Sequence, residues 1–307
     1  MIGSHLVDLL LDARVREVVV LDDLSRGRKE NLAGAMRRGG LTFVHGDIRD
    51  RELLAKTFAG IDVLYHLAAI RLTQCAEQPR LSLEVMVDGT FNVFEAACKA
   101  GVARLVAASS ASVYGAADAF PTEETHHSYN DRTFYGAAKA YGESLLRCFR
   151  EANGLDYVAL RPFNVYGPRM DTLGAYTEVL VRWMDRIAQG KAPIVFGDGA
   201  QTMDFVYVED VARAFLLAAT RGRPGEVYNV ASGTETSLLG LAQALLKAMG
   251  SEAGVEFAPP RAGSPVPRRL AAIDKARREL GFEAAFSLDA GLRRLVDWWR
   301  PLQGERA

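Results

Sequence analysis

Short apolar runs alternate along the chain with longer stretches in which apolar residues recur every three or four positions. The short runs are rich in β-branched residues, which predicts strands at 18–23, 41–47, 63–69, 104–109 and 157–161. The longer stretches predict helices at 2–11, 51–58, 82–100 and 135–152. Because the strands are apolar at nearly every position and alternate with helices, we predict an α/β fold with a doubly wound parallel sheet.

The pattern becomes less regular after about residue 167. Helices are predicted at 176–189 and 208–220 and short strands at 194–196 and 228–230, and a Pro/Gly-rich segment at 258–267 precedes two helical stretches. We interpret residues 1–167 as the main domain and 168–307 as a smaller α/β lobe, some of whose strands and helices return to the main sheet. Such a lobe would close over the carboxyl ends of the strands, where open α/β sheets bind ligands.

Composition and charge narrow the class of protein. The net charge of −1 gives no electrostatic reason to expect nucleic acid or an anionic membrane as a partner. No apolar run approaches the length of a membrane span, and the first residues lack the pattern of a signal peptide. Cys75, Cys98 and Cys148 are far apart and lack metal-type spacing, so we expect reduced, buried thiols in a cytoplasmic protein and no metal site.

The stretch from Ser109 to Lys139 carries the candidate chemistry. Tyr135 and Lys139 are four residues apart and would share one face of a helix, where an ammonium lowers the pKa of a neighbouring phenol. The spacing alone is a weak signal, because a half-buried tyrosine with a solvated lysine one turn later is common. However, Tyr135 is the one tyrosine with a lysine four positions on, and the serines after the preceding strand supply a third member. We therefore predict an acid–base device that takes a proton from a substrate hydroxyl.

Ordered motifs along the chain resemble those of the extended short-chain dehydrogenase/reductase family, and within it the NAD-dependent nucleotide-sugar epimerases and dehydratases. The motifs lie at residues 2–6, 21–22, 46–48, 66–69, 89–93, 109–115, 135–139, 161–168 and 197–199. The resemblance, which is to enzymes of the UDP-glucose 4-epimerase type, implies a Rossmann-type NAD-binding domain at 1–167 and a substrate-binding lobe at 168–307. It also implies a homodimer formed through the helices at 82–100 and 135–152.

The same resemblance implies which residues hold NAD. Asp22, at the end of a strand, would accept hydrogen bonds from the adenosine ribose, which favours NAD over NADP because a 2′-phosphate would meet its charge. The full set that it implies is Gly3, Asp22, Asp47, Ile48, Leu67, Ala68, Ala69, Tyr135, Lys139 and Pro162.

For the reaction, the resemblance implies that Tyr135 is the base and that Lys139 binds the nicotinamide ribose. Ser110, with Ser112 as a second candidate, would contact the reacting hydroxyl of a nucleotide sugar, most simply a UDP-sugar. The substrate-binding set that it implies is Arg71, Ser110, Asn164, Arg169, Arg261 and Arg268. Asn164 and Arg261 would meet the diphosphate, while Arg169 or Arg268 could meet a carboxylate such as that of a uronic acid. The alternative for these arginines is an ordinary solvated loop charge.

The chain departs from the family pattern at its first motif. The glycine fingerprint is present only as its last member, Gly3, so the first strand of the family fold is missing from this chain. That strand is normally central, and we expect its absence to leave two neighbouring strands unpaired. Met86, Met203 and Ser264 stand where the family commonly has Asn, Arg and an acid, which weakens inferences about substrate contacts.

Epimerisation at C4 of a UDP-hexose or UDP-uronic acid, through a 4-keto sugar, is the favoured reaction. Family 4,6-dehydratases carry an Asp-Glu pair where this chain has Ala111 and Ser112, and sugar-acid decarboxylases usually carry Glu at the position of Ser112. Neither residue here can act as a carboxyl acid or base. An alternative from another class is a relative that binds NAD and a nucleotide sugar without turnover. Replacing Tyr135 with Phe would separate the two, because it would abolish turnover only in an enzyme.

Overall fold

A parallel sheet of four strands carries the candidate site. The computed structural model describes residues 1–172, 177–260 and 266–304. In this sheet β3 (Val63–His66), β4 (Arg104–Ala108), β5 (Tyr157–Pro162) and β9 (Glu226–Val230) pair in the order β3-β4-β5-β9, all parallel. Since consecutive strands of a parallel sheet need crossover connections, helices lie between them in the chain and cover the sheet.

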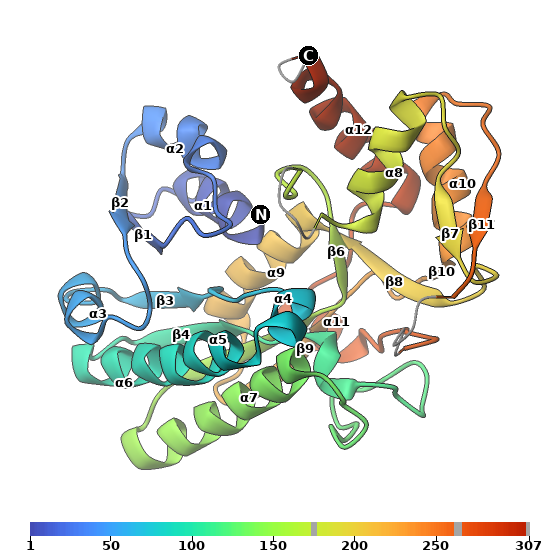
Figure 1. Ribbon diagram of the computed structural model, residues 1–307. Helices are drawn as coiled ribbons and strands as arrows, with labels where there is room; N and C mark the ends of the chain where they lie inside the picture. Colours follow the sequence, from blue (N-terminus) through green and yellow to red (C-terminus); the bar gives the residue numbers. More distant parts are fainter. Residues whose placement is uncertain (173–176, 261–265, 305–307) are drawn as a thin grey trace.

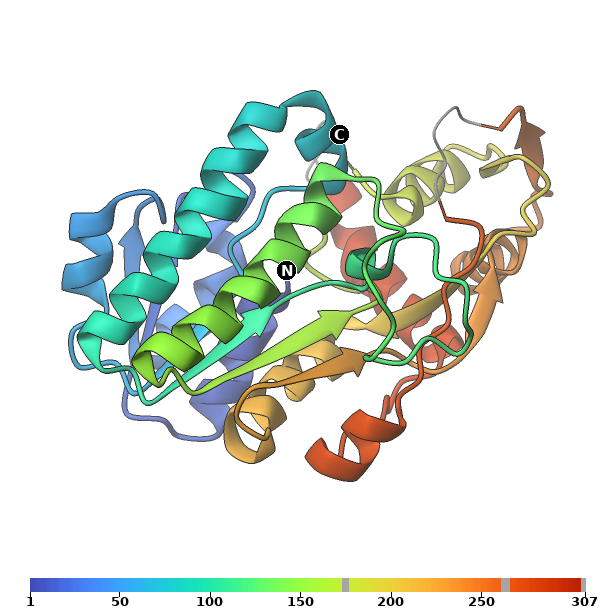
Figure 2. The same ribbon diagram turned by 90° about the horizontal axis from the view of Figure 1, so that it is seen from below.

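The predicted doubly wound arrangement is confirmed by the side chains of the central strands. Val106 of β4 and Leu160 of β5 pack toward α1 (Ile2–Asp12) and α9 (Val208–Arg221). Leu105 and Ala159, one position earlier on each strand, pack toward α6 (Thr90–Ala100) and α7 (Phe134–Asn153). Figures 1 and 2 show α6 and α7 together on one side of the sheet and α9 on the other. The sheet is thus buried on both faces, as its apolar strands predict.

Strands β1 (Val18–Asp22) and β2 (Leu41–His45) form a separate parallel pair. In the described chain β1 pairs only with β2 and β3 pairs only with β4, so the sheet is interrupted between β1 and β3 (Figure 1). A cavity lined by residues of both strands lies at this interruption. The expectation that two neighbouring strands lack a partner is therefore confirmed.

The predicted helix over 82–100 is not a single regular helix. The structure has α5 (Pro79–Leu83), a π-helical segment (Glu84–Gly89) and then α6. Gly89 lies against Ile48, and a Cβ at Gly89 would come within 2.7 Å of the Ile48 side chain. The segment therefore comes close to the loop after β2 at the point where its helical turn is the wider π type. The prediction of one continuous regular helix was wrong.

The second half of the chain builds smaller sheets and its own apolar core. The order β10-β8-β6 forms one sheet and β11-β7 another, and the core around them contains Trp183 and Trp299. However, α9, β9 and α11 pack with the main sheet rather than with this core, so the boundary at residue 167 stays an interpretation. The strands are β6 (Asn164–Tyr166), β7 (Ile194–Phe196), β8 (Thr202–Tyr207), β10 (Glu235–Ser237) and β11 (Glu256–Ala258).

The remaining helices connect these strands or cover their edges. They are α2 (Ala33–Arg38), α3 (Arg51–Thr57), α4 (Leu72–Glu77), α8 (Val179–Ala188), α10 (Leu238–Met249), α11 (Asp274–Leu280) and α12 (Leu288–Gly304), with single 3-10 turns at Lys29–Leu32 and Ala111–Tyr114. Within the described ranges, none of the helices has the length and apolarity that crossing a membrane requires.

Candidate active site

The serine cluster lies at the carboxyl end of β4. Ser109 is buried and its hydroxyl donates to the carboxylate of Glu143 on α7. The hydroxyl of Ser110 accepts from the backbone N–H of Ser112 at 3.1 Å, which starts the 3-10 turn Ala111–Tyr114. This turn points the chain away from the sheet. Ser110 consequently faces the cavity, whereas Ser112 is buried in the turn and does not line it.

Tyr135 and Lys139 are placed by the first turns of α7. Thr133 caps this helix, since its hydroxyl accepts from the backbone N–H of Gly136 at 3.0 Å. The Lys139 ammonium donates to the carbonyl oxygen of Ala108 at 2.6 Å and lies 5.9 Å from the centre of the Tyr135 ring. The end of β4 and the start of α7 thereby bring Ser110, Tyr135 and Lys139 to the wall of one cavity.

Burial has the largest influence on the pKa values of Tyr135 and Lys139. Burial raises the pKa of Tyr135, and the hydrogen bond with Ser110 and the charges of Arg26 and Arg269 act in the opposite direction. Burial likewise lowers the pKa of Lys139, to about 8. The sequence led us to expect that Lys139 lowers the pKa of Tyr135, but two arginines are the cations that do so in the structure.

The cavity has a volume of about 1080 Å³ and runs from Tyr135 to the interruption between β1 and β3. All the residues that the sequence assigned to the cofactor line it: Gly3, Asp22, Asp47, Ile48, Leu67, Ala68, Ala69, Tyr135, Lys139 and Pro162. A dinucleotide needs a long groove at the carboxyl ends of parallel strands and an acidic residue that binds its ribose hydroxyls. It also needs small residues where its diphosphate comes close to the protein backbone. Asp22 ends β1, and Ala68 and Ala69 follow β3, so these residues fit NAD.

The arginines that the sequence assigned to the substrate are mostly held by carboxylates. Arg71 pairs with Glu178 at 3.1 Å and lines the cavity. Arg169 pairs with Asp8 at 2.7 Å and also lines it. Their roles in substrate binding stay predictions.

Arg268 and Asn164 are not among the residues that line the cavity. Arg268 forms a two-pronged ion pair with Glu235, with nitrogen–oxygen distances of 2.7 and 2.9 Å. Asn164 begins β6, and its buried side-chain oxygen has no hydrogen-bond partner among the described residues. Arg261 lies outside the described residues.

Sequence reasoning passed over Arg269 and Arg26. Arg26 lines the cavity in the loop after β1, and the charge of each arginine reaches Tyr135. The alternation of an extended segment could have indicated Arg269, because adjacent arginines on such a segment point to opposite sides.

A buried ionic network lies behind Tyr135 and Lys139. Glu143, one turn after Lys139, accepts from Arg161 of β5 at 2.8 and 2.6 Å, in addition to its bond with Ser109. Arg161 also donates to the hydroxyl of Tyr114 at 2.8 Å. The network fastens α7 to the ends of β4 and β5 and so fixes the distance between the serines and the Tyr135 helix.

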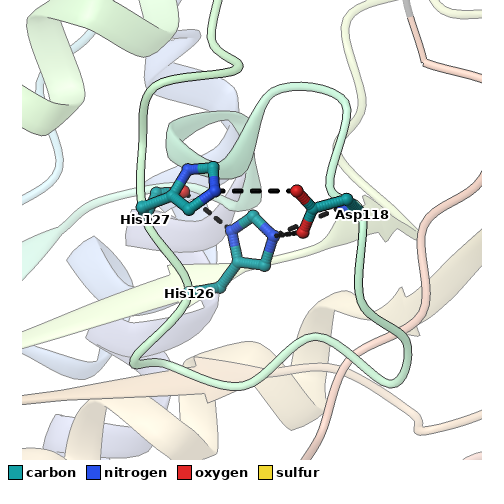
Figure 3. Close-up of side chains that lie close together, drawn as sticks. All are labelled: Asp118, His126 and His127. Atoms are coloured by element: carbon teal, nitrogen blue, oxygen red, sulfur yellow. Dashed lines mark hydrogen bonds and ion pairs between the residues drawn. The ribbon is translucent and has the colours of Figure 1, made fainter.

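The loop between the serine turn and α7 is closed by Asp118, His126 and His127 (Figure 3). His126 has its Nδ1 2.7 Å from the carbonyl oxygen of His127 and its Nε2 2.8 Å from Asp118. By position these side chains could hold a metal ion. However, both ring nitrogens of His126 already have protein partners, which are the carbonyl oxygen of His127 at Nδ1 and the carboxylate and backbone N–H of Asp118 at Nε2. We therefore interpret Asp118, His126 and His127 as residues whose mutual contacts hold this loop in place.

Comparison with known proteins identifies the class to which this fold and site belong. Residues 1–231 match the NAD dependent epimerase/dehydratase family. The chain belongs to that family, whose cofactor is NAD, and its relatives are enzymes that act on nucleotide sugars.

Three individual proteins show how far the similarity extends. A UDP-glucose 4-epimerase of Mycolicibacterium smegmatis is 39% identical over 305 residues, covering 97% of this chain and 95% of the relative. The crystal structure of UDP-glucose 4-epimerase with UDP-glucose from Thermotoga maritima has a TM-score of 0.92 at 33% identity, covering 99% and 96% of the two chains. A dTDP-glucose 4,6-dehydratase of an Actinoplanes species is 31% identical, covering 97% and 94%. The family is thus fixed, while its members catalyse more than one reaction.

Proposed function

We propose that this protein is an NAD-dependent epimerase that inverts C4 of a UDP-hexose or UDP-uronic acid through a 4-keto sugar. The observation that carries the proposal is the meeting of Ser110, Tyr135 and Lys139 at the wall of the cavity that the cofactor residues line. A binding module has no need of a buried phenol, a hydroxyl and an ammonium at one point. This argues against the alternative of a relative that binds without turnover.

The roles of these side chains follow from their positions. Tyr135 takes the proton of the sugar C4 hydroxyl, and Ser110 holds that hydroxyl and shares the proton. NAD, held by the residues that line the groove, would supply a reversible hydride acceptor for C4. Lys139, fixed by Ala108, carries a positive charge at neutral pH and would bind the ribose of the cofactor. The charges of Arg26 and Arg269 favour the phenolate of Tyr135. The 4-keto sugar must rotate in the site between loss and return of the hydride, so that its other face is presented. The protein therefore holds the intermediate through its nucleotide.

A dehydratase or a decarboxylase is the second candidate, because such enzymes occur among the relatives. Ala111 and Ser112 argue against it. Both are buried in the turn that follows Ser110, with 2% and 5% exposure, and neither offers a carboxyl group to the cavity.

The reaction is tested by product identification. The purified protein is incubated with saturating NAD and, in separate reactions, UDP-glucose, UDP-glucuronic acid and dTDP-glucose, and the products are identified by NMR. We expect the C4 epimer of a UDP-sugar and no dehydrated or decarboxylated product. A 4-keto-6-deoxy sugar or a pentose would overturn the proposal in favour of the second candidate. Binding of NAD and UDP-sugar without any product would favour the non-catalytic relative.

A further inference from the structure

Arg71 and Glu178 meet at the wall of the cavity from different parts of the chain. Arg71 lies between β3 of the main sheet and α4, whereas Glu178 immediately precedes α8 in the second half of the chain. The guanidinium of Arg71 donates from Nη2 to Oε1 of Glu178 at 3.1 Å, and both residues line the cavity. Their side chains are 12% and 38% exposed. This ion pair therefore connects the two parts of the chain beside the space that a ligand would occupy.

The carboxylate of Glu178 is not used by its own helix. Glu178 is the N-cap residue of α8, a position from which a polar side chain commonly accepts a hydrogen bond from the first backbone amides of the helix. Within the described part of the chain its side chain makes no such bond, and Oε1 accepts from Arg71 instead. The contact that this side chain makes is therefore with a cation of the cavity wall, and not with α8.

The guanidinium of Arg71 is anchored at one nitrogen and keeps its other donors available. A guanidinium carries several N–H groups in a planar fork. Among the residues that the structure describes, Glu178 is the one hydrogen-bond partner of the Arg71 side chain, through Nη2. The remaining N–H groups belong to a residue of the cavity wall, where a ligand with several acceptor oxygens could meet them. Phosphate groups are the anions that match such a fork best.

A second arginine of the cavity wall explains why Arg71 needs a carboxylate partner. Arg26 lies in the loop after β1 and also lines the cavity. Burial lowers the pKa of Arg26, the charge of Arg71 lowers it further, and the charge of Glu178 raises it. The two cations thus repel each other, and Glu178 offsets the repulsion. Without this carboxylate, Arg71 would lose its partner and would be driven away from Arg26.

We propose that Glu178 is a positioning residue, which holds Arg71 at the cavity wall so that its guanidinium binds a diphosphate group. NAD and a nucleotide sugar both carry a diphosphate, and for the nucleotide sugar the inference rests on the proposed function. An arginine that is already held in its binding geometry loses less conformational freedom when the ligand arrives, which increases affinity. Because Glu178 belongs to the second half of the chain, the affinity of the site depends on how this half is placed against the main sheet.

Binding measurements on matched variants test the role of Glu178. All variants are made in the Tyr135→Phe protein, so that substrate is not consumed, and each is titrated by calorimetry with NAD and, separately, with UDP-glucose. We expect Glu178→Ala to weaken the binding of at least one of the two ligands about tenfold, as the loss of a charge-assisted contact implies. Glu178→Gln keeps an oxygen acceptor for Arg71 and should retain most of the affinity. Glu209→Ala, which breaks an ion pair with Arg294 away from the cavity, is the control and should leave both affinities unchanged.

A double variant separates positioning from a general structural role. Arg71→Met should weaken the binding of the same ligand, and adding Glu178→Ala to it should weaken binding no further, because Glu178 acts through Arg71. The ligand that is affected is the one whose diphosphate Arg71 binds. Unchanged or tighter binding in Glu178→Ala, or a full further loss in the double variant, would overturn the inference and leave C4 epimerisation intact. Binding of neither ligand by the Tyr135→Phe protein would overturn both the inference and the proposed function.

Discussion

The Lys139 ammonium lies 5.9 Å from the centre of the Tyr135 ring and donates to the carbonyl oxygen of Ala108 at 2.6 Å. One lysine therefore connects α7 to the end of β4, the strand that precedes Ser110. Because that lysine is buried, its protonation is linked both to folding and to the chemistry of the site.

The pH dependence of stability follows from the pKa of Lys139. Burial lowers it from 10.5 to about 8, so between these values the unfolded chain binds more protons than the folded one. The destabilisation of the folded state by this buried positive charge is fully present below pH 8. It disappears as the pH rises toward 10.5, because folded Lys139 is then neutral. We expect the unfolding free energy of the wild type to rise by about 3 kcal/mol relative to Lys139→Met across this window. Urea unfolding of both proteins at several pH values measures the difference, and parallel pH curves would contradict it.

The ionic network behind the site should be important for stability. Glu143→Ala leaves Arg161 buried without its two-pronged partner, and breaking such a buried pair costs about 3–5 kcal/mol. Arg38→Ala, which breaks an exposed pair with Asp12, is the control and should change stability by about 0.5 kcal/mol or less. Urea unfolding of both variants checks the contrast. Equal effects would show that the network does not hold α7 to the sheet.

The unpaired edges of β1 and β3 predict that a further strand can be accommodated. An apolar strand and a glycine-rich turn fused ahead of Met1 should pair with both edges and supply amides to the cofactor groove. We expect a higher melting temperature and tighter NAD binding. The control is the same extension with a proline at its centre, which a central strand does not tolerate. If both extensions behave alike, the interruption in the sheet is not a strand site.

The predicted homodimer is tested through the two helices that the resemblance assigned to it. Phe91 on α6 and Tyr141 on α7 are large side chains with 41% and 43% exposure. We expect wild-type protein to be a dimer by light scattering and the double variant Phe91→Glu, Tyr141→Glu to be a monomer, because charges would be placed in an apolar interface. Phe257→Glu, at an exposed position on β11, should leave the dimer intact. A wild-type monomer would contradict the proposal.

The sequence predicted the main sheet because apolar strands and 3.6-residue periodicity are local signals. The strands β6, β10 and β11, of three residues each, were not predicted, and neither was β8, which has six; the equally short β7 was predicted because its three residues are all apolar. The helix α10 was not predicted either. The π-helical segment before α6 depends on the contact of Gly89 with Ile48, and local sequence does not specify that contact.

The site was predicted less completely than the fold. Motif spacing located Tyr135 and Lys139 on one helix, but only the structure shows that Lys139 reaches Ala108. For Arg268 and Arg269, the side that each faces is set by the contacts of their segment with Thr122 and Thr202, which are distant in the sequence.

Isotope retention tests the central claim most directly. UDP-glucose and UDP-glucuronic acid labelled with deuterium at C4 are each converted to equilibrium in ordinary water with NAD present, and the products are examined by NMR. The account predicts a C4 epimer that keeps its deuterium, because the hydride leaves C4 and returns within one closed site while Tyr135 exchanges only the hydroxyl proton. An epimer that has lost the label to water, or turnover that survives in Tyr135→Phe, would contradict it.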